Sequence, residues 1–221
     1  MNKKLLKNLV KINFKTIIFN FNYFPFQQAI KLPVLVSRNT YFKRLRGDVK
    51  IECPIRFGMI KLGYNNCHIF DKKLSRTIWR VDGKVKFKGT ANIGHGSKIN
   101  LGKKGEITIG DNFTINAEST LKIEKGLTIG NDVLISWDVL IMDSDCHHIY
   151  QEEKIINPPQ DIHIADKVWI GCRNLILKGA HIRENSVIGA NSLVNNDLLT
   201  ANAAYVGTPA RMVKEGICWE K

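Results

Sequence analysis

The sequence predicts an all-β fold, a parallel β-helix whose coils have three flat sides. Six aliphatic residues recur at intervals of six in one unbroken run: Ile164, Ile170, Ile176, Ile182, Ile188 and Val194. A period of six fits neither the 3.6 residues of a helical turn nor the alternation of one strand, whereas three such units make an 18-residue coil. A shift of 18 places Ile164 on Ile182 and Gly171 on Gly189, as a repeating coil requires.

The period of six continues beyond this run. Upstream it is present in three shorter runs, Phe87 to Ile99, Ile109 to Leu121 and Ile123 to Ile141. Slips separate these runs, and a solenoid tolerates slips because each coil contacts only its neighbours. Downstream, a further shift of 18 predicts that Val206 follows Ile188 in the stack.

A small or polar residue follows many of the inward aliphatic residues. Gly130 follows Ile129 and Gly189 follows Ile188. Glycine adopts tight turns and left-handed backbone angles at little steric cost. We therefore expect these positions to form the corners of the coils.

An N-terminal segment, 1–48, precedes the repeat. Apolar residues from Leu5 to Ile12 alternate with lysines at roughly helical spacing, which predicts a basic amphipathic helix. Two interpretations remain open: the helix caps the exposed end of the solenoid, or it attaches peripherally to an anionic inner membrane. The longest apolar stretch, Thr16 to Phe26, is too short and too polar to span a bilayer.

The chain divides into four expected segments. These are an N-terminal helical segment at 1–48, irregular first coils with an outward loop from Asp71 to Asp82 at 49–86, the regular β-helix at 87–214 with a protruding loop at 142–163, and a C-terminal tail at 215–221.

The composition indicates an intracellular protein with acidic partners. Five cysteines without metal-like spacing favour a reducing compartment, and no secretory signal is convincing, so we expect a cytoplasmic location. The net charge of +13 suits a phosphate-rich cofactor, an acidic glycan or a membrane surface. We expect no nucleic-acid binding, because the aromatic residues are not interleaved with the basic ones as stacking platforms would be.

The longest interruption of the repeat is the best candidate for a functional site. Ile141 and Ile164 are 23 residues apart where one coil needs 18, so about five residues are expected to leave the prism. The segment contains the only adjacent histidines, His147 and His148, close to Asp143 and Asp145. Imidazole is suited to general-base catalysis near neutral pH, and a carboxylate can orient it.

Trp169 is expected to face outward. Its neighbours Val168 and Ile170 occupy inward positions, so alternation along the strand turns the indole to the outer surface. Trp137 projects outward by the same argument. An exposed tryptophan is costly unless something covers it, which indicates a neighbouring subunit or a bound ligand.

These motifs resemble those of the hexapeptide-repeat acyltransferases, including capsular and exopolysaccharide O-acetyltransferases. The resemblance covers roughly Lys86 to Lys214 and includes the units Ile188-Gly189-Ala190-Asn191-Ser192-Leu193 and Gly207-Thr208-Pro209-Ala210-Arg211. It implies a left-handed parallel β-helix, a homotrimer with active sites between subunits, and acetyl-CoA as co-substrate. The left-handedness rests on the resemblance alone, since parallel crossovers are otherwise almost always right-handed.

The resemblance also implies roles for individual residues. His147 stands at the position of the catalytic general base, with His148 as the alternative or as an acceptor-binding residue, and Asp145 or Asp143 would orient the ring. Coenzyme A would contact a second set: Trp169, Gly171, Lys178, Gly189, Ala190, Arg211 and Lys214. Ser136 or a backbone amide near Trp137 is a candidate oxyanion donor, and both residues are expected on the acceptor side.

The favoured function is transfer of an acetyl group to a hydroxyl of a cell-surface polysaccharide or its sugar precursor, in a ternary complex. The alternative within the enzyme class is N-acylation of an amino sugar or nucleotide-sugar. A zinc carbonic-anhydrase-like protein is less favoured, because adjacent histidines fit poorly to a three-histidine zinc site, and no metal is expected. A purely structural β-helix would have no need of the histidine-rich loop.

Overall fold

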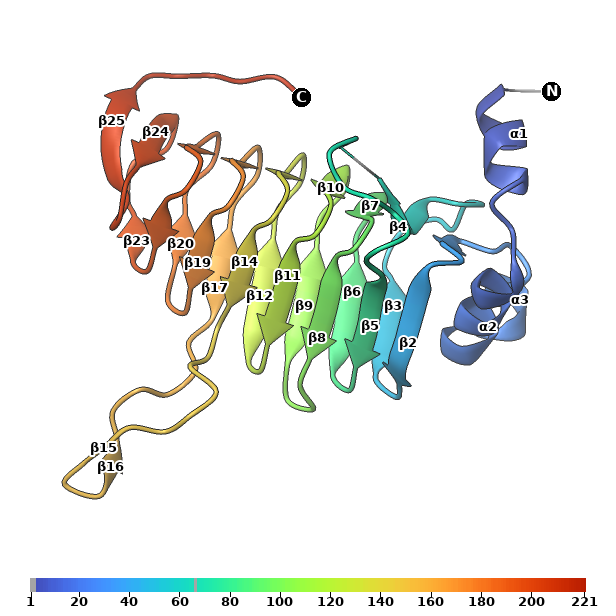
Figure 1. Ribbon diagram of the computed structural model, residues 1–221, viewed down its shortest axis with the longest axis horizontal. Coiled ribbons are helices and arrows are strands. Elements are labelled where there is room, and N and C mark those ends of the chain that lie inside the picture. The colour runs from blue at the N-terminus through green and yellow to red at the C-terminus, as the bar shows by residue number, and fades with distance from the viewer. Residues whose placement is uncertain (1–2, 66) are drawn as a thin grey trace.

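The chain winds around an elongated prism with three flat sides (Figure 1). The computed structural model describes residues 3–65 and 67–221, so residues 1 and 2 of the expected N-terminal segment lie outside it. Each side of the prism is a parallel sheet, and the inward side chains form one continuous apolar core. The predicted all-β solenoid is confirmed.

Successive strands enter three sheets in turn. Sheet A contains β1 (Val34–Val36), β4 (Ile60–Asn65), β7 (Ala91–Gly94), β10 (Phe113–Ile115), β13 (Leu134–Ile135), β18 (Trp169–Ile170), β21 (Val187–Ile188), β24 (Ala203–Val206) and the antiparallel β25 (Arg211–Glu215). Sheet B contains β2 (Thr40–Leu45), β5 (Thr77–Val81), β8 (Lys98–Leu101), β11 (Thr120–Ile123), β14 (Leu140–Met142), β19 (Leu175–Leu177) and β22 (Leu193–Val194). Sheet C contains β3 (Asp48–Ile51), β6 (Lys84–Phe87), β9 (Glu106–Ile109), β12 (Gly126–Ile129), β17 (Ile162–Ile164), β20 (His181–Ile182) and β23 (Asp197–Leu198).

The 18-residue register holds for most of the last coils and fails at the end. Ile164 pairs with Ile182 and Ile176 with Val194, as the shift of 18 requires. Ile188, however, pairs with Tyr205, so the inward position predicted for Val206 is wrong by one residue. Val206 is exposed, whereas Tyr205 is buried and its hydroxyl bonds both the backbone nitrogen and the carbonyl oxygen of Thr200.

The glycines at the corners serve a different purpose from the expected one. Gly171 does not have a positive φ, but a Cβ there would lie 2.8 Å from the backbone nitrogen of Ala190 in the next coil. The left-handed angle occurs two residues after the glycine, at Asp132, Arg173 and Asn191. Close stacking of coils therefore requires the glycine, and the following residues make the turn.

The solenoid begins earlier than expected. β1 and β2 lie within the segment assigned to the N-terminal cap, and β5 lies within the outward loop expected from Asp71 to Asp82. The loop that does leave the prism joins β4 to β5. The period of six does not reveal these coils because long connections interrupt them. Val49 of β3 and Val85 of β6 pair on adjacent strands, yet the sequence between them is as long as two ordinary coils.

The N-terminal helices are α1 (Lys3–Leu9), α2 (Phe14–Tyr23) and α3 (Phe26–Ala29), and they lie at one end of the prism (Figure 1). α2 packs on the edge strand β1. The side chain of Asn20 accepts a hydrogen bond from the Val34 nitrogen and donates one to the Val34 oxygen, and Thr16 bonds Val36 in the same way. These bonds satisfy the free edge of sheet A. None of the helices in the described part of the chain is long and apolar enough to cross a membrane.

Candidate active site

The loop that leaves the prism between β14 and β17 is longer than expected. In the preceding coil, Leu121 of sheet B is followed closely in the chain by Ile129 of sheet C, whereas their register partners Ile141 and Ile164 lie much further apart. The sequence analysis compared the spacing of Ile141 and Ile164 with the length of a whole coil, although these residues lie on neighbouring sheets of the same coil. The expected insertion is therefore too short. The loop ends in the antiparallel hairpin of β15 (Tyr150–Gln151) and β16 (Lys154–Ile155), which stands well away from the body (Figure 1).

Asp143 holds the start of this loop against the previous coil. Its side chain is fully buried. One carboxylate oxygen accepts a hydrogen bond from the Glu124 nitrogen at 2.8 Å, and the other accepts from the nitrogens of Lys125 at 2.7 Å and Gly126 at 2.8 Å. Asp143 thus has backbone partners in place of the histidine ring that it was a candidate to orient.

Asp145 binds the coil that follows the loop, whereas Asp143 binds the coil that precedes it. Its carboxylate forms an ion pair with Lys178 and accepts a hydrogen bond from the Asn157 amide at 2.8 Å. These two partners, Lys178 first, hold the pKa of Asp145 below its usual range. Lys178, which was expected to contact coenzyme A, lies at the base of the loop.

Asn157 joins the two strands of the loop around His147. Its amide nitrogen donates to the His147 carbonyl oxygen at 2.9 Å, and its amide oxygen accepts from the Ile149 nitrogen at 2.6 Å. Because the same amide also binds Asp145, Asn157 links the backbone of His147 and Ile149 to the ion pair between Asp145 and Lys178. The sequence analysis did not single out this residue, which lies on the returning strand of the loop.

His147 and His148 are exposed and line one pocket of about 540 Å³. Another part of the lining comes from the corner between sheets B and C in preceding coils. Its basic residues are Lys103, Lys104 and Lys122. Lys122 is paired with Glu124, whereas in the described part of the chain neither Lys103 nor Lys104 has a carboxylate within ion-pair distance. The site therefore combines an imidazole with a basic wall.

A second group of expected residues lies on sheet A and its corner with sheet B. Trp169 faces outward as expected, with 37% of its surface exposed, and its indole nitrogen donates to the Ser136 hydroxyl at 3.2 Å. Trp137 is the next residue of that corner. Gly171, Gly189 and Ala190 form the two corners that follow in the stack.

The C-terminal tail covers part of this face. Trp219 lies beside Trp169, with ring centroids 5.9 Å apart, and its indole nitrogen donates to the Lys167 carbonyl oxygen. Arg211 and Lys214 are exposed on β25, at the end of sheet A. The outward tryptophan is thus covered in part by the chain's own tail.

The expected site residues therefore fall into two groups at different corners of the prism. His147, His148, Asp143, Asp145 and Lys178 lie at the corner between sheets B and C. The other group lies on sheet A and its corner with sheet B: Ser136, Trp137, Trp169, Gly171, Gly189, Ala190, Arg211 and Lys214. The strands of sheet B lie between the two corners, so one chain does not bring the groups together.

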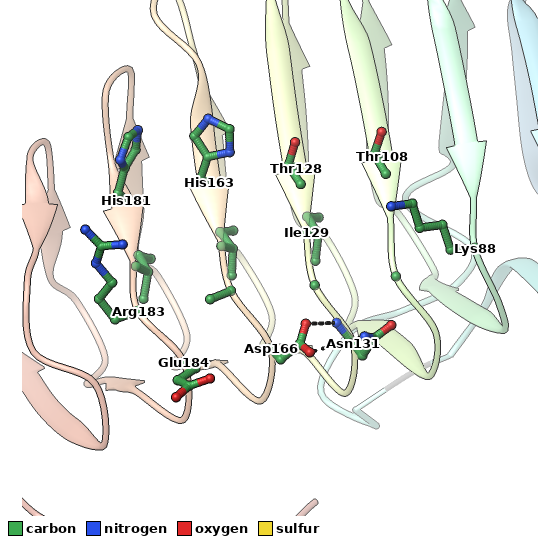
Figure 2. Close-up of a pocket in the computed structure, with 15 residues that line it drawn as sticks. Lys88, Thr108, Thr128, Ile129, Asn131, His163, Asp166, His181, Arg183 and Glu184 are labelled. Atoms are coloured by element: carbon green, nitrogen blue, oxygen red, sulfur yellow. Dashed lines mark hydrogen bonds between the residues drawn. The ribbon is translucent and has the colours of Figure 1, made fainter.

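A further groove, of about 510 Å³, follows the outer face of sheet C (Figure 2). His163 and His181 project from neighbouring strands with ring centroids 4.7 Å apart, and His181 contacts Asp197 at 3.1 Å. None of the expected site residues lines it. Within the described residues, no three histidine, cysteine or acidic side chains gather into a metal-binding group.

Comparison with known proteins identifies relatives over most of the chain. No family model matches it. The polysialic acid O-acetyltransferase of Neisseria meningitidis is 34% identical over 198 residues, which cover 86% of this chain and 80% of that protein. The galactoside O-acetyltransferase of Escherichia coli K12 is 36% identical over 112 residues, 49% of this chain and 54% of that protein.

Among solved structures, the chain is similar to the polySia-specific acetyltransferase NeuO, with a TM-score of 0.57 and 27% sequence identity. The similar region covers 85% of this chain and 76% of that one. This likeness confirms the left-handed parallel β-helix expected from the sequence.

Proposed function

The chain belongs to the hexapeptide-repeat acetyltransferases, and from this premise we propose that it transfers an acetyl group from acetyl-CoA to a hydroxyl of a cell-surface polysaccharide or of its sugar precursor. The observation that carries the proposal is the pocket in which His147 faces a basic wall beside a protruding loop. The free cysteines and the need for acetyl-CoA both suit a cytoplasmic location.

His147 acts as the general base. Its imidazole takes the proton of the acceptor hydroxyl as the sugar oxygen attacks the thioester carbonyl, and it then gives this proton to the departing thiolate of coenzyme A. A positioned base of this kind contributes roughly 10²- to 10⁴-fold to the rate. Asn157 is a positioning residue, because its amide holds the backbone of His147, and Asp145 acts through Asn157 by binding the same amide.

The active site is completed by a second subunit of a homotrimer. The separation of the two residue groups supports this, since the expected coenzyme-binding residues of one chain and its own His147 loop lie at different corners of the prism. The hairpin also exposes four large apolar side chains that a neighbour would cover: Ile149, Tyr150, Ile155 and Ile156. Closed symmetric rings are the usual form of such assemblies.

The coenzyme lies along the corner between sheets A and B. Trp169 offers an outward ring for the pantetheine arm, and the corners at Gly171, Gly189 and Ala190 offer backbone groups for its amides. Arg211 and Lys214 stand exposed at the end of this path, where the nucleotide phosphates would be bound. Lys178 is withdrawn from this set because it is paired with Asp145.

The acceptor is an acidic saccharide. The lysines opposite His147 support this, since Lys103 and Lys104 would pair with carboxylates of the sugar. His148 lines the same pocket and is the acceptor-side histidine, while Ser136 and Trp137 would contribute from the neighbouring chain. The relative from Neisseria meningitidis bears the name of an acidic polysaccharide, polysialic acid.

Substitution of His147 tests the proposal. We expect His147→Ala to abolish acetyl transfer to an acidic oligosaccharide while calorimetry still detects coenzyme A binding. His163→Ala, which removes an exposed histidine on the outer face of sheet C, is the matched control and should keep most of the turnover. Near-native turnover of His147→Ala would refute the base, undetectable coenzyme A binding by the wild type would refute the acyltransferase, and an acetyl group found on nitrogen would favour the amino-sugar alternative.

A further inference from the structure

The helix α2 has two unlike faces. Thr16, Phe19 and Asn20 are buried against the end of the solenoid. Phe14, at 74% exposure, and the exposed side chain of Phe21 lie on the opposite face. The capping role therefore accounts for one face of α2 and leaves the other unexplained.

Exposed apolar residues recur along this segment, and we call them the apolar stripe. Its members are Val10, Phe14, Ile17, Phe21, Phe26 and Ile30. Spacings of three and four residues place Phe14, Ile17 and Phe21 on one side of α2, and the rings of Phe21 and Phe26 are 6.1 Å apart. Contiguous apolar surfaces of this kind mark interaction sites.

A basic pocket of about 330 Å³ adjoins the stripe at Val10. Its cationic residues are Lys11, Arg38 and Lys72. Within the described residues, none of these three has a carboxylate within ion-pair distance. Burial, and then the nearby charges of Lys61 and Lys7, lower the pKa of Lys11.

We propose that this end of the molecule binds the surface of an anionic lipid bilayer. The basic pocket takes the charged part of a lipid headgroup, and the apolar stripe enters the boundary between headgroups and acyl chains. A bilayer fits better than a second copy of this chain. Self-association through a two-fold axis would bring the cationic pockets of both copies into one interface, where the like charges would repel.

Vesicle binding by the full chain tests this inference independently of catalysis. We expect the wild type to sediment with phosphatidylcholine vesicles that contain phosphatidylglycerol at least about tenfold more strongly than with phosphatidylcholine alone, and high salt should weaken this preference. Phe14→Ser combined with Phe21→Ser should abolish binding to both vesicles. Arg38→Gln combined with Lys72→Gln should abolish only the preference for the anionic ones.

Two exposed residues elsewhere provide matched controls. Leu74, at 86% exposure in the loop between β4 and β5, controls for loss of an apolar side chain, and Lys154 on the distal hairpin controls for loss of a charge. Leu74→Ser and Lys154→Gln should bind as the wild type does, and circular dichroism should show that every variant is folded.

Three results would overturn the inference. These are equal binding of the wild type to neutral and anionic vesicles, unchanged binding after Phe14→Ser and Phe21→Ser, and equal loss in the Leu74→Ser control. A fourth result would indicate a second copy of this chain as the partner in place of the bilayer. This result is that Phe14→Ser combined with Phe21→Ser forms a smaller assembly than the wild type in sedimentation velocity without vesicles.

Discussion

The ion pair between Asp145 and Lys178 joins the start of the protruding loop to the coil that follows it. Lys178 also donates to the Asn157 carbonyl oxygen at 3.2 Å, so one ammonium group reaches both strands of the loop. The geometry of His147 therefore depends on a lysine that belongs to the prism and not to the loop.

Removal of this lysine should loosen the loop with little effect on the fold. We expect Lys178→Met to lower kcat about tenfold, because a base must be held in place to be effective, while the free energy of unfolding changes by less than about 1 kcal/mol. Limited proteolysis should cut the variant within 143–161 faster than the wild type. Lys154→Met, on the distal hairpin, is the control, and equal cleavage of the two variants would contradict the anchoring role.

Asp143 should matter for stability more than for chemistry. Asp143→Ala leaves three backbone nitrogens without their acceptor, and we expect the free energy of unfolding to fall by about 3 kcal/mol. This corresponds to a decrease in Tm of about 6 to 12 °C. Asp161→Ala, which removes a surface pair with Lys125, should change Tm by less than about 4 °C. Comparable values for the two variants in thermal unfolding would argue against the buried role of Asp143.

The attachment of α2 should weaken at high pH. The hydroxyl of Tyr23 accepts a hydrogen bond from the Trp79 indole at 3.0 Å, and burial raises the pKa of Tyr23 from its ordinary 10.0 to about 12. The neutral phenol is the stabilising form, so its contribution is complete below pH 10 and is lost as the pH rises through about 12. Chemical unfolding between about pH 9 and about pH 12 should show a steeper fall for the wild type than for Tyr23→Phe. Parallel curves would contradict the assignment.

The sequence predicted the inward positions best in coils that keep the period of six without an insertion. The pairing of Ile164 with Ile182 is of this kind. The last coil is one residue shorter than the repeat, so Tyr205 and not Val206 takes the inward position. The sequence pattern did not reveal this, because the residue at the expected position, Val206, is also aliphatic. Tyr205 is accepted in the core because Thr200 satisfies its hydroxyl, and such a contact has no signature in a periodic pattern.

The sequence pointed to a location for the candidate site but not to its set of contacts. The interruption of the repeat located His147, whereas Lys103 and Lys104 approach it only because coils stack in space. Asn20 illustrates the same limit. As a polar residue it counted against a membrane span, but its partner is the backbone of Val34, which only the folded chain brings close.

Mixed assemblies test whether His147 and Trp169 of different chains form one active site. Co-expression of His147→Ala with Trp169→Ala should give about a quarter of the wild-type specific activity at low acetyl-CoA concentration, because one contact in four pairs an intact histidine with an intact tryptophan in a closed ring. Each variant alone should be nearly inactive.

The control is the wild type mixed with a chain that carries both substitutions. It should also retain about a quarter if the residues act across subunits, but about half if they act within one chain. Half the activity in this control, with none in the mixture of single variants, would show that each chain holds a complete site.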